Sequence, residues 1–303
     1  MRTQTSHLSV AVLGTGLMGA PMAVTLLNNG FNVRVWNRTS DRAAPLAACG
    51  ATVLSSAAEA VAESDIVILM LENGAAVGEV ANRLIGHLQP STIVIDMSST
   101  SHAEALALHS LMASHGIACL DAPVSGGVAG ARAGTLAIMA GGARENFDRA
   151  TALFNALGRA TLVGPPGAGQ IAKLCNQLIV GATLNIVAEA LLLAQAAGAD
   201  PAAVRQALRG GFAESRILEV HGQRMLDRDF RPGGQVRSQR KDLDNVALAA
   251  AAAGLHLPLA EMVRAHFQAL PENADRADQS AVLLAVEQSN PGRRLGTAPD
   301  QLS

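Results

Sequence analysis

The sequence predicts a two-domain protein, with a doubly wound α/β sheet followed by an all-α domain and a long interdomain helix joining them. Up to about residue 165, short apolar runs alternate with segments of helical periodicity, whereas every later segment is helical in pattern. The paired prolines of Gly164-Pro-Pro-Gly167 interrupt the chain between the two halves. We therefore expect domains at residues 1–165 and 166–303, which fits the chain length of 303.

The alternating elements of the first half predict a parallel sheet that is covered on both faces. Ser56 and Ser101 are each followed three residues later by a glutamate, which is the capping-box pattern of a helix start. Because the intervening runs are apolar throughout, their strands should be buried on both sides. Ligands of such sheets bind at the carboxyl ends of the strands. The expected strands are residues 8–13, 32–36, 65–71, 92–96 and 117–121, and the main expected helices are 20–27, 76–88 and 101–115.

A glycine-rich turn joins the first strand to the first helix. Its sequence is Gly14-Thr-Gly16-Leu17-Met18-Gly19. Gly14 permits a tight turn, Gly16 lets a pyrophosphate approach the backbone, and Gly19 lets helix and strand pack closely. The N–H groups at the start of the following helix would then face the phosphates. The pattern predicts a Rossmann-type dinucleotide-binding domain; the alternative is a glycine turn without a ligand.

The end of the second strand indicates which dinucleotide is preferred. Asn37, Arg38 and Thr39 follow this strand, and no acidic residue occurs before Asp41. NAD enzymes usually carry an acidic residue here for the ribose 2′-hydroxyl, whereas an arginine suits a 2′-phosphate. We therefore predict NADP(H) in preference to NAD(H). The alternative is a solvated arginine at a strand end.

The segment from Gly167 to Ala197 should form the long interdomain helix. A helix this apolar is expected to be buried nearly all round, so Lys173 in its first turns needs a specific reason. Residues three and four apart share a helix face, so Lys173, Asn176 and Gln177 should point into one cleft. The most apolar part is interrupted by Asn185 and Glu189, which favours a buried soluble helix over a membrane span.

Composition excludes several classes of function. A net charge of −2 gives no electrostatic reason to bind nucleic acid or an anionic membrane. The three cysteines lack zinc or disulfide spacing, which is typical of a reduced cytoplasmic protein with thiols as small core residues. The eight histidines share no metal-ligand spacing either, and His256 and His266 are assigned to packing or surface. We therefore predict no metal.

Several motifs occur in a specific order along the chain. Ser125-Gly126-Gly127, within Asp121-Ala-Pro-Val-Ser-Gly-Gly127, offers a hydroxyl and successive N–H groups for an anion, although a plain turn is an equally good interpretation. Together with the glycine turn, Gly134-Thr-Leu-Ala-Ile-Met139, Gly167-Ala-Gly-Gln-Ile-Ala-Lys-Leu-Cys-Asn-Gln177 and Lys241-Asp-Leu243, this segment closely resembles the β-hydroxyacid dehydrogenase family. The resemblance extends from Leu8 to about Leu270, and its members include 3-hydroxyisobutyrate dehydrogenase and tartronate semialdehyde (2-hydroxy-3-oxopropionate) reductase.

The resemblance implies a role for each matching residue. Ser125, Gly126 and Gly127 would bind the substrate carboxylate, and Lys173 would be catalytic. Asn176 and Gln177 fall where the family has an asparagine pair that orients substrate and lysine, and the second position departs from that pattern. Ser99 would contact nicotinamide or substrate, Lys241 would contact the cofactor, and Leu71 lies in a cofactor-facing loop.

On physical grounds, Lys173 suits reduction of a carbonyl. Hydride transfer leaves an alkoxide, which needs a proton and a positive neighbour. Burial in an apolar helix would lower the lysine pKa from its ordinary value near 10.4 towards neutrality. The alternative is a lysine paired with a carboxylate across the domain interface. The predicted enzyme is an NADPH-dependent oxidoreductase acting on a small β-hydroxy acid or its semialdehyde; the other hypotheses are imine reduction and a non-catalytic NADP-binding protein.

The second half carries departures from the relatives. Gly234 stands where many relatives have Phe, and Ser238 and Arg240 stand where they have apolar residues; in the family this segment lies over the nicotinamide and substrate. Arg237 adds a further positive charge to the segment. The hypothesis is a roomier, more cationic pocket for a larger or more polar substrate; alternatively, the arginines face solvent or the 2′-phosphate. The tail from Pro291 is polar and expected to be loose, and a homodimer or homotetramer is expected. Further helices are expected at 201–209, 215–226, 240–253, 258–269 and 280–288.

Overall fold

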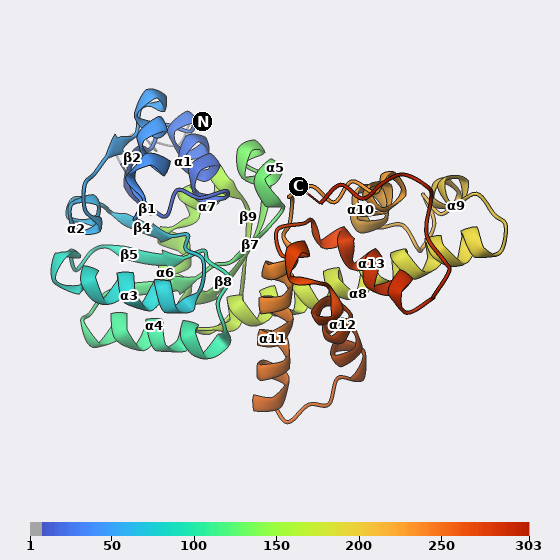
Figure 1. Ribbon diagram of the computed structural model, residues 1–303. Helices are drawn as coiled ribbons and strands as arrows, with labels where there is room; N and C mark the ends of the chain where they lie inside the picture. Colours follow the sequence, from blue (N-terminus) through green and yellow to red (C-terminus); the bar gives the residue numbers. More distant parts are fainter. Residues whose placement is uncertain (1–7, 303) are drawn as a thin grey trace. The chain divides into compact units, whose positions relative to one another are not determined.

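The structure is a computed structural model that describes residues 8–302 (Figure 1). The chain divides into two compact units, Met1–Lys173 and Leu174–Ser303. The expected domain boundary at residue 165 precedes this division by less than three helical turns. The long helix α8, Ala168–Ala196, starts in the first unit and continues into the second.

The first unit is built on a nine-stranded sheet in the order β3-β2-β1-β4-β5-β6-β8-β7, with β9 paired to β8. The pairs from β3 to β6 are all parallel. The strands are β1 Ser9–Leu13, β2 Asn32–Trp36, β3 Thr52–Val53, β4 Ile66–Leu69, β5 Ile93–Asp96, β6 Ala118–Asp121, β7 Val124–Ser125, β8 Leu136–Gly142 and β9 Gly158–Gly164.

Helices cover both faces of this sheet (Figure 1). Alternate residues of β1 enter two different cores, Val10 and Val12 on one face and Ala11 and Leu13 on the other. Both cores are fully buried at these positions, which confirms the predicted doubly wound α/β fold. The helices are α1 Gly19–Asn28, α2 Ala57–Val61, α3 Gly74–Leu84, α4 His102–Ser114, α5 Gly127–Ala133, α6 Arg144–Arg149 and α7 Thr151–Leu157, with short 3₁₀ turns at 40–42, 44–49 and 85–87.

The last three strands depart from the parallel pattern. β8 is antiparallel to both β6 and β7, and β9 runs parallel to β8. The sequence did not predict β8 or β9, because their alanine and glycine content hides the usual strand signature. A Cβ at Gly158 would lie 2.0 Å from the Leu136 carbonyl oxygen, so the start of β9 requires glycine there.

The second unit is all helical, as predicted. Its core is formed around α8, whose Leu184, Ala188 and Leu191 are buried against the later helices. The helices after α8 are α9 Pro201–Ala207, α10 Arg216–Asp227, α11 Val236–Ala252, α12 Pro258–Ala269 and α13 Val282–Gln288, with 3₁₀ turns at 272–274 and 279–281. His266 packs in this unit through a 2.7 Å hydrogen bond to Asn185, and His256 is exposed, as expected.

Helix α8 is not buried all round, contrary to expectation. Ile179, Ile186 and Leu193 are 66%, 57% and 70% exposed, and they repeat every seventh residue. By length and composition alone α8 is also apolar enough to cross a membrane, with 39% of its most apolar window buried. The single chain therefore leaves an apolar stripe along this helix.

The expectation of core thiols is correct for one cysteine only. Cys119 is buried, whereas Cys49 and Cys175 are exposed, and all three are free. Burial, reinforced by the nearby carboxylates of Asp96 and Asp121, raises the pKa of the Cys119 thiol well above its ordinary value. This thiol is therefore kept protonated and unreactive.

The tail from Pro291 is packed against the second unit, so the prediction of a loose tail was wrong. Leu295 is fully buried, and Gln301 forms a bridge with Asp229. The buried guanidinium of Arg228 donates to Asp300 and, at 2.8 Å, to the Leu295 carbonyl. The buried Arg228 side chain thereby binds the segment after Pro291, which has no hydrophobic periodicity of its own.

Candidate active site

The glycine turn has the geometry of a phosphate-binding loop. Gly14 has φ +102°, and a Cβ on Gly19 would lie 1.8 Å from the Gly14 carbonyl oxygen, so both positions require glycine for the fold. A Cβ on Gly16 would meet nothing within 4 Å, which leaves open space at the turn. No side chain caps the N-terminus of α1, and the buried Thr15 hydroxyl has no hydrogen-bond partner within the described part of the chain. These features fit a bound pyrophosphate.

The residues after β2 form the neighbouring wall of this loop. The Asn37 side chain accepts a hydrogen bond from the Thr15 N–H at 3.0 Å and donates one to the Thr39 carbonyl at 2.9 Å. Asn37 thus braces the glycine turn through its side chain. Arg38 and Thr39 are exposed beside it, where a cation would suit an additional phosphate.

The loop after β5 is attached to the loop after β4. The buried Ser98 hydroxyl accepts a hydrogen bond from the Leu71 N–H at 3.0 Å, and the Ser98 N–H donates to Asp96 at 3.0 Å. A Cβ on Gly14 would lie 3.0 Å from the Leu71 side chain, so the glycine turn is adjacent. Ser99 is half-buried in this loop. The structure therefore brings Gly14, Leu71 and Ser99 together at the carboxyl edge of the sheet.

The first turn of α8 is anchored on the same edge by a buried carboxylate. Asp121, at the end of β6, accepts hydrogen bonds from the N–H groups of Gly167 at 2.8 Å and Gln170 at 2.9 Å. His109 on α4 lies 3.0 Å from the same carboxylate. A Cβ on Gly169 would lie 2.5 Å from the Asp121 carbonyl oxygen, so glycine permits this close approach. The carboxylate caps α8 from another element and faces the positive end of its dipole.

Lys173 lies one turn after this anchor. It belongs to the first unit, together with the glycine turn and the Ser98–Thr100 loop, and only 9% of it is exposed. A cation buried to this degree needs compensation or a chemical role. The sequence motif signalled this residue, but it gave no role to Gln170 or Asp121, which carry the anchoring contacts.

The Ser125-Gly126-Gly127 segment is an accessible turn in the first unit. Ser125 pairs with Ala137 at the end of β7, and the next two glycines are exposed. Gly126 and Gly127 have φ values of +131° and +61°, conformations that favour glycine. A Cβ on Gly127 would meet nothing within 4 Å, so its backbone is open to a ligand.

Asn176 and Gln177 belong to a half-buried amide network in the second unit. The Gln177 side-chain nitrogen donates to Asp242 at 2.8 Å and to Gln239 at 3.0 Å, while its oxygen accepts from Asn176 at 2.8 Å. Both amide hydrogens of Gln177 are therefore already used inside the protein. Lys241 is half-buried and lies 3.7 Å from Asp242.

Of the two arginines in the segment after α10, Arg240 is used for contacts within its own unit, so the hypothesis of a cationic pocket rests on Arg237 alone. Arg240 donates to the carbonyls of Phe267 and Leu270 and pairs with Asp275, so it caps the end of α12. Arg237 is exposed, and its Nε donates to Gln235 at 2.8 Å. A Cβ on Gly234 would lie 3.0 Å from the end of the Gln279 side chain. Of the two arginines, only Arg237 remains exposed.

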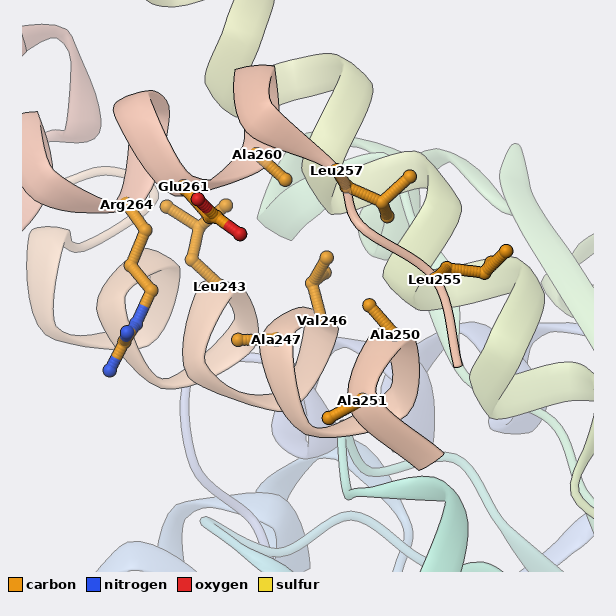
Figure 2. Close-up of a pocket in the computed structure, with 10 residues that line it drawn as sticks. All are labelled: Leu243, Val246, Ala247, Ala250, Ala251, Leu255, Leu257, Ala260, Glu261 and Arg264. Carbon is orange, nitrogen blue, oxygen red and sulfur yellow. The ribbon is translucent and has the colours of Figure 1, made fainter. Parts of the chain in front are cut away.

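A small pocket between α11 and α12 contains none of the predicted site residues (Figure 2). Its lining is mostly aliphatic, with one acidic and one basic side chain at its edge. The lining includes Val246, Ala250, Leu257, Ala260, Glu261 and Arg264. The pocket belongs to the second unit and is lined by neither the glycine turn nor Lys173, so we do not assign it to the reaction.

Comparison with known proteins identifies the family of this chain. The profile of the NAD binding domain of 6-phosphogluconate dehydrogenase matches residues 9–164, and the profile described as NAD-binding of NADP-dependent 3-hydroxyisobutyrate dehydrogenase matches residues 167–286. The 2-hydroxy-3-oxopropionate reductase of Escherichia coli K12 is 41% identical over 285 residues, covering 92% of this chain and 97% of that protein.

Solved structures give the same result. The Mycobacterium tuberculosis 3-hydroxyisobutyrate dehydrogenase with L-serine has a TM-score of 0.85 and 33% identity, covering 92% of this chain and 99% of its own. An imine reductase from Pseudomonas sp. has a TM-score of 0.62, 21% identity and coverages of 92% and 99%, which shows a shared fold alone. The chain therefore belongs to the β-hydroxyacid dehydrogenase family of oxidoreductases, which act on CH–OH groups.

Proposed function

We propose that this protein is an NADPH-dependent oxidoreductase that interconverts a small β-hydroxy acid and its semialdehyde or keto acid. The observation that carries the proposal is the buried Lys173, anchored through its helix to the strand edge that also holds the glycine turn and Ser99. The names of the related proteins point to the same class of substrate, a short hydroxy acid or its aldehyde.

Different residues of the chain would bind the cofactor, bind the substrate and transfer the proton. The glycine turn and the uncapped start of α1 would hold the pyrophosphate, and the bound nicotinamide supplies or accepts the hydride. Ser125, Gly126 and Gly127 would bind the substrate carboxylate through a hydroxyl and backbone N–H groups. Lys173 would donate a proton to the oxygen of the reduced carbonyl and remove it in the reverse direction.

Lys173 carries the chemical step, so its removal is the direct test. General acid–base groups contribute about 10²- to 10⁴-fold to rates. We expect Lys173→Met, which keeps the length of the side chain, to lower kcat by that factor while NADPH affinity stays within a few-fold. The assay is NADPH oxidation over a panel of carboxylated semialdehydes and keto acids. Full activity of the variant on its best substrate would refute the role of Lys173.

The two alternative functions predict different turnover in the same substrate panel, once cyclic imines are included. Imine reduction predicts turnover of cyclic imines in preference to carboxylated aldehydes, and a non-catalytic NADP-binding protein predicts binding without turnover. Neither alternative explains why a buried lysine and a turn suited to a carboxylate occur in one unit. The imine reductase likeness supports this fold but not this chemistry, since only 21% of residues are identical.

The preference for NADPH rests on Arg38, which is exposed at the end of β2 with no acidic neighbour before Asp41. A charge-assisted hydrogen bond to the 2′-phosphate would contribute about 1.5–3 kcal/mol, or roughly 10- to 150-fold in affinity. We expect Arg38→Ala to weaken NADPH binding by such a factor and to leave NADH binding unchanged. Equal losses for the two cofactors would contradict the preference.

We also propose a cytoplasmic homodimer or homotetramer. The stripe of Ile179, Ile186 and Leu193 supports it, because exposed apolar side chains at heptad spacing are suited to pairing with another helix. Sedimentation of the purified chain gives the oligomeric state directly. A monomer at micromolar concentration would contradict this part of the proposal.

The cationic pocket for a larger substrate loses its main support, since Arg240 caps α12 within its own unit. A short substrate with one carboxylate needs no second cationic site beyond Ser125, Gly126 and Gly127. We therefore expect the smallest β-hydroxy acids and semialdehydes of the panel to give the highest kcat/KM.

A further inference from the structure

Gln170 stands out among the buried polar residues of the first unit. It is fully buried, one turn before Lys173 on α8, and the resemblance to known enzymes assigns it no role. Its side-chain nitrogen donates to the Ser98 carbonyl at 2.8 Å, and its side-chain oxygen accepts from the Thr100 N–H at 3.1 Å. One carboxamide thus bonds to the backbone on both sides of Ser99.

The backbone of Gln170 is fixed as firmly as its side chain. Its N–H donates to the Asp121 carboxylate at 2.9 Å, and the Gly167 N–H donates to the same carboxylate at 2.8 Å. The first turn of α8 is therefore attached to the ends of two neighbouring strands, β5 through the Ser98–Thr100 loop and β6 through Asp121. A rigid turn of helix then connects this attachment to Lys173.

We propose that Gln170 is a positioning residue that fixes Ser99 relative to Lys173. The inference rests on the proposed function, in which Ser99 contacts nicotinamide or substrate and Lys173 transfers the proton. The carboxamide is the only side-chain group bonded to the backbone at both neighbours of Ser99 among residues 8–302. Without this carboxamide, the Ser98–Thr100 loop and helix α8 would each keep their fold, but Ser99 would no longer be held at a fixed position relative to Lys173.

The first test removes both hydrogen bonds while keeping the volume of the side chain. A misplacement of about 1 Å can cost roughly 100-fold in rate, so we expect Gln170→Met to lower kcat by about 10- to 100-fold. The KM for NADPH should change by less than about three-fold, because the glycine turn is untouched. Hydrogen exchange of the Thr100 amide, which loses its acceptor, should accelerate by at least about ten-fold.

Thr92 provides a matched control in the same unit. Its buried hydroxyl donates to the Ser64 carbonyl at 2.9 Å, at the amino end of β5 and so at the opposite end of the strand from Ser98. Thr92→Val also removes one buried side-chain bond to the backbone. We expect it to lower the thermal midpoint as Gln170→Met does, with kcat unchanged. Equal losses of kcat in the two variants would overturn the proposal, as would wild-type kcat in Gln170→Met.

A second variant keeps the proposal testable if Gln170→Met does not fold. In Gln170→Glu, a protonated carboxyl can reproduce both bonds, whereas an ionised one directs an oxygen at the Ser98 carbonyl. The nearby carboxylates of Asp121 and Asp96, and burial itself, favour the protonated form of the introduced glutamate side chain. The positive charge of Lys173 favours the ionised form, and His109 is already paired with Asp121. We expect kcat relative to the wild type to rise by about ten-fold between about pH 8 and about pH 6. The thermal midpoint relative to the wild type should rise in the same direction, because the folded protein favours the protonated carboxyl.

A ratio that does not change with pH would overturn the proposal. Failure of the proposed function is recognised separately, because the wild-type chain would then turn over no member of the panel. In that case the exchange measurement still decides: faster exchange at Thr100 in Gln170→Met supports the positioning role, and unchanged exchange refutes it.

Discussion

Replacing Asp121 by asparagine tests how α8 is anchored. The carboxylate is fully buried and accepts two backbone N–H groups, one on each oxygen: Gly167 on Oδ1 and Gln170 on Oδ2. Asparagine has the same shape but only one acceptor oxygen. In either orientation of the amide, its NH₂ group faces one of the two N–H donors.

The expected cost follows from these contacts. One buried N–H loses its acceptor, which costs about 1–3 kcal/mol. Loss of the negative charge at the N-terminus of a 29-residue helix costs a further ~0.3–1 kcal/mol. We therefore expect Asp121→Asn to lower the free energy of unfolding by about 1.5–4 kcal/mol, a large share of the roughly 5–15 kcal/mol typical of a domain.

Urea unfolding followed by the fluorescence of Trp36, the only tryptophan of the chain, reports on the first unit. Asp65→Asn is the matched control in the same unit, because Asp65 is exposed and its carboxylate accepts from the Ser9 N–H at 2.9 Å. Asparagine keeps an acceptor oxygen for this N–H and no group is left buried without a partner, so the midpoint should not change. If Asp121→Asn cost less than about 1 kcal/mol, the anchoring role of this carboxylate would be refuted.

Three further perturbations address other parts of the molecule. Arg228→Met breaks a buried ion pair, which should cost about 3–5 kcal/mol and accelerate hydrogen exchange of the tail; unchanged exchange would mean that the tail is held elsewhere. The pKa of Asp278 is raised by burial but held below its ordinary value by hydrogen bonds, chiefly from His221. Because its pKa is lowered, ionised Asp278 stabilises the fold above its ordinary pKa near 3.9, and this stabilisation is lost as pH falls through the lower pKa of the folded state. Asp278→Asn should therefore flatten the acid-induced loss of stability below about pH 4. Gly19→Ala should reduce the thermal midpoint because its Cβ would lie 1.8 Å from a backbone oxygen, whereas Gly16→Ala, with open space, should weaken NADPH binding only; the reverse pattern would contradict the loop assignment.

Local pattern was sufficient to predict most of the fold. Strand β2 and helix α12 have the predicted bounds, because each combines a clear periodicity with a definite start or stop signal. The capping box at Ser101 forms with both reciprocal bonds. The packed tail could not be predicted, because its contacts come from residues distant in the sequence, such as Arg228, 72 residues from Asp300, and Gln195, 101 residues from Gly296. No local periodicity encodes such a contact.

In the candidate site, too, some residues could be predicted from the sequence and others depend on tertiary contacts. The glycine turn and Lys173 were found because motif and spacing carry their chemistry. The partners of Gln170 lie 70 and 72 residues earlier in the chain, and those of Gln177 lie 62 and 65 residues later. Spacing along one helix predicted that Gln177 would face a ligand, but its hydrogen-bonding capacity depends on tertiary neighbours. Whether it also contacts substrate stays a prediction.

The choice of a carboxamide beside Lys173 has a physical reason. Lys173 is the only basic residue in α8, and Glu189, more than four turns away, is the only acidic one. A glutamate at position 170 could accept from Thr100 as Gln170 does, but its charge would stabilise the ammonium form of a lysine that must give up its proton. The carboxylate at this end of the helix, Asp121, is instead occupied by backbone N–H groups and His109. The helix is thus anchored without placing an unpaired negative charge beside the proposed proton donor.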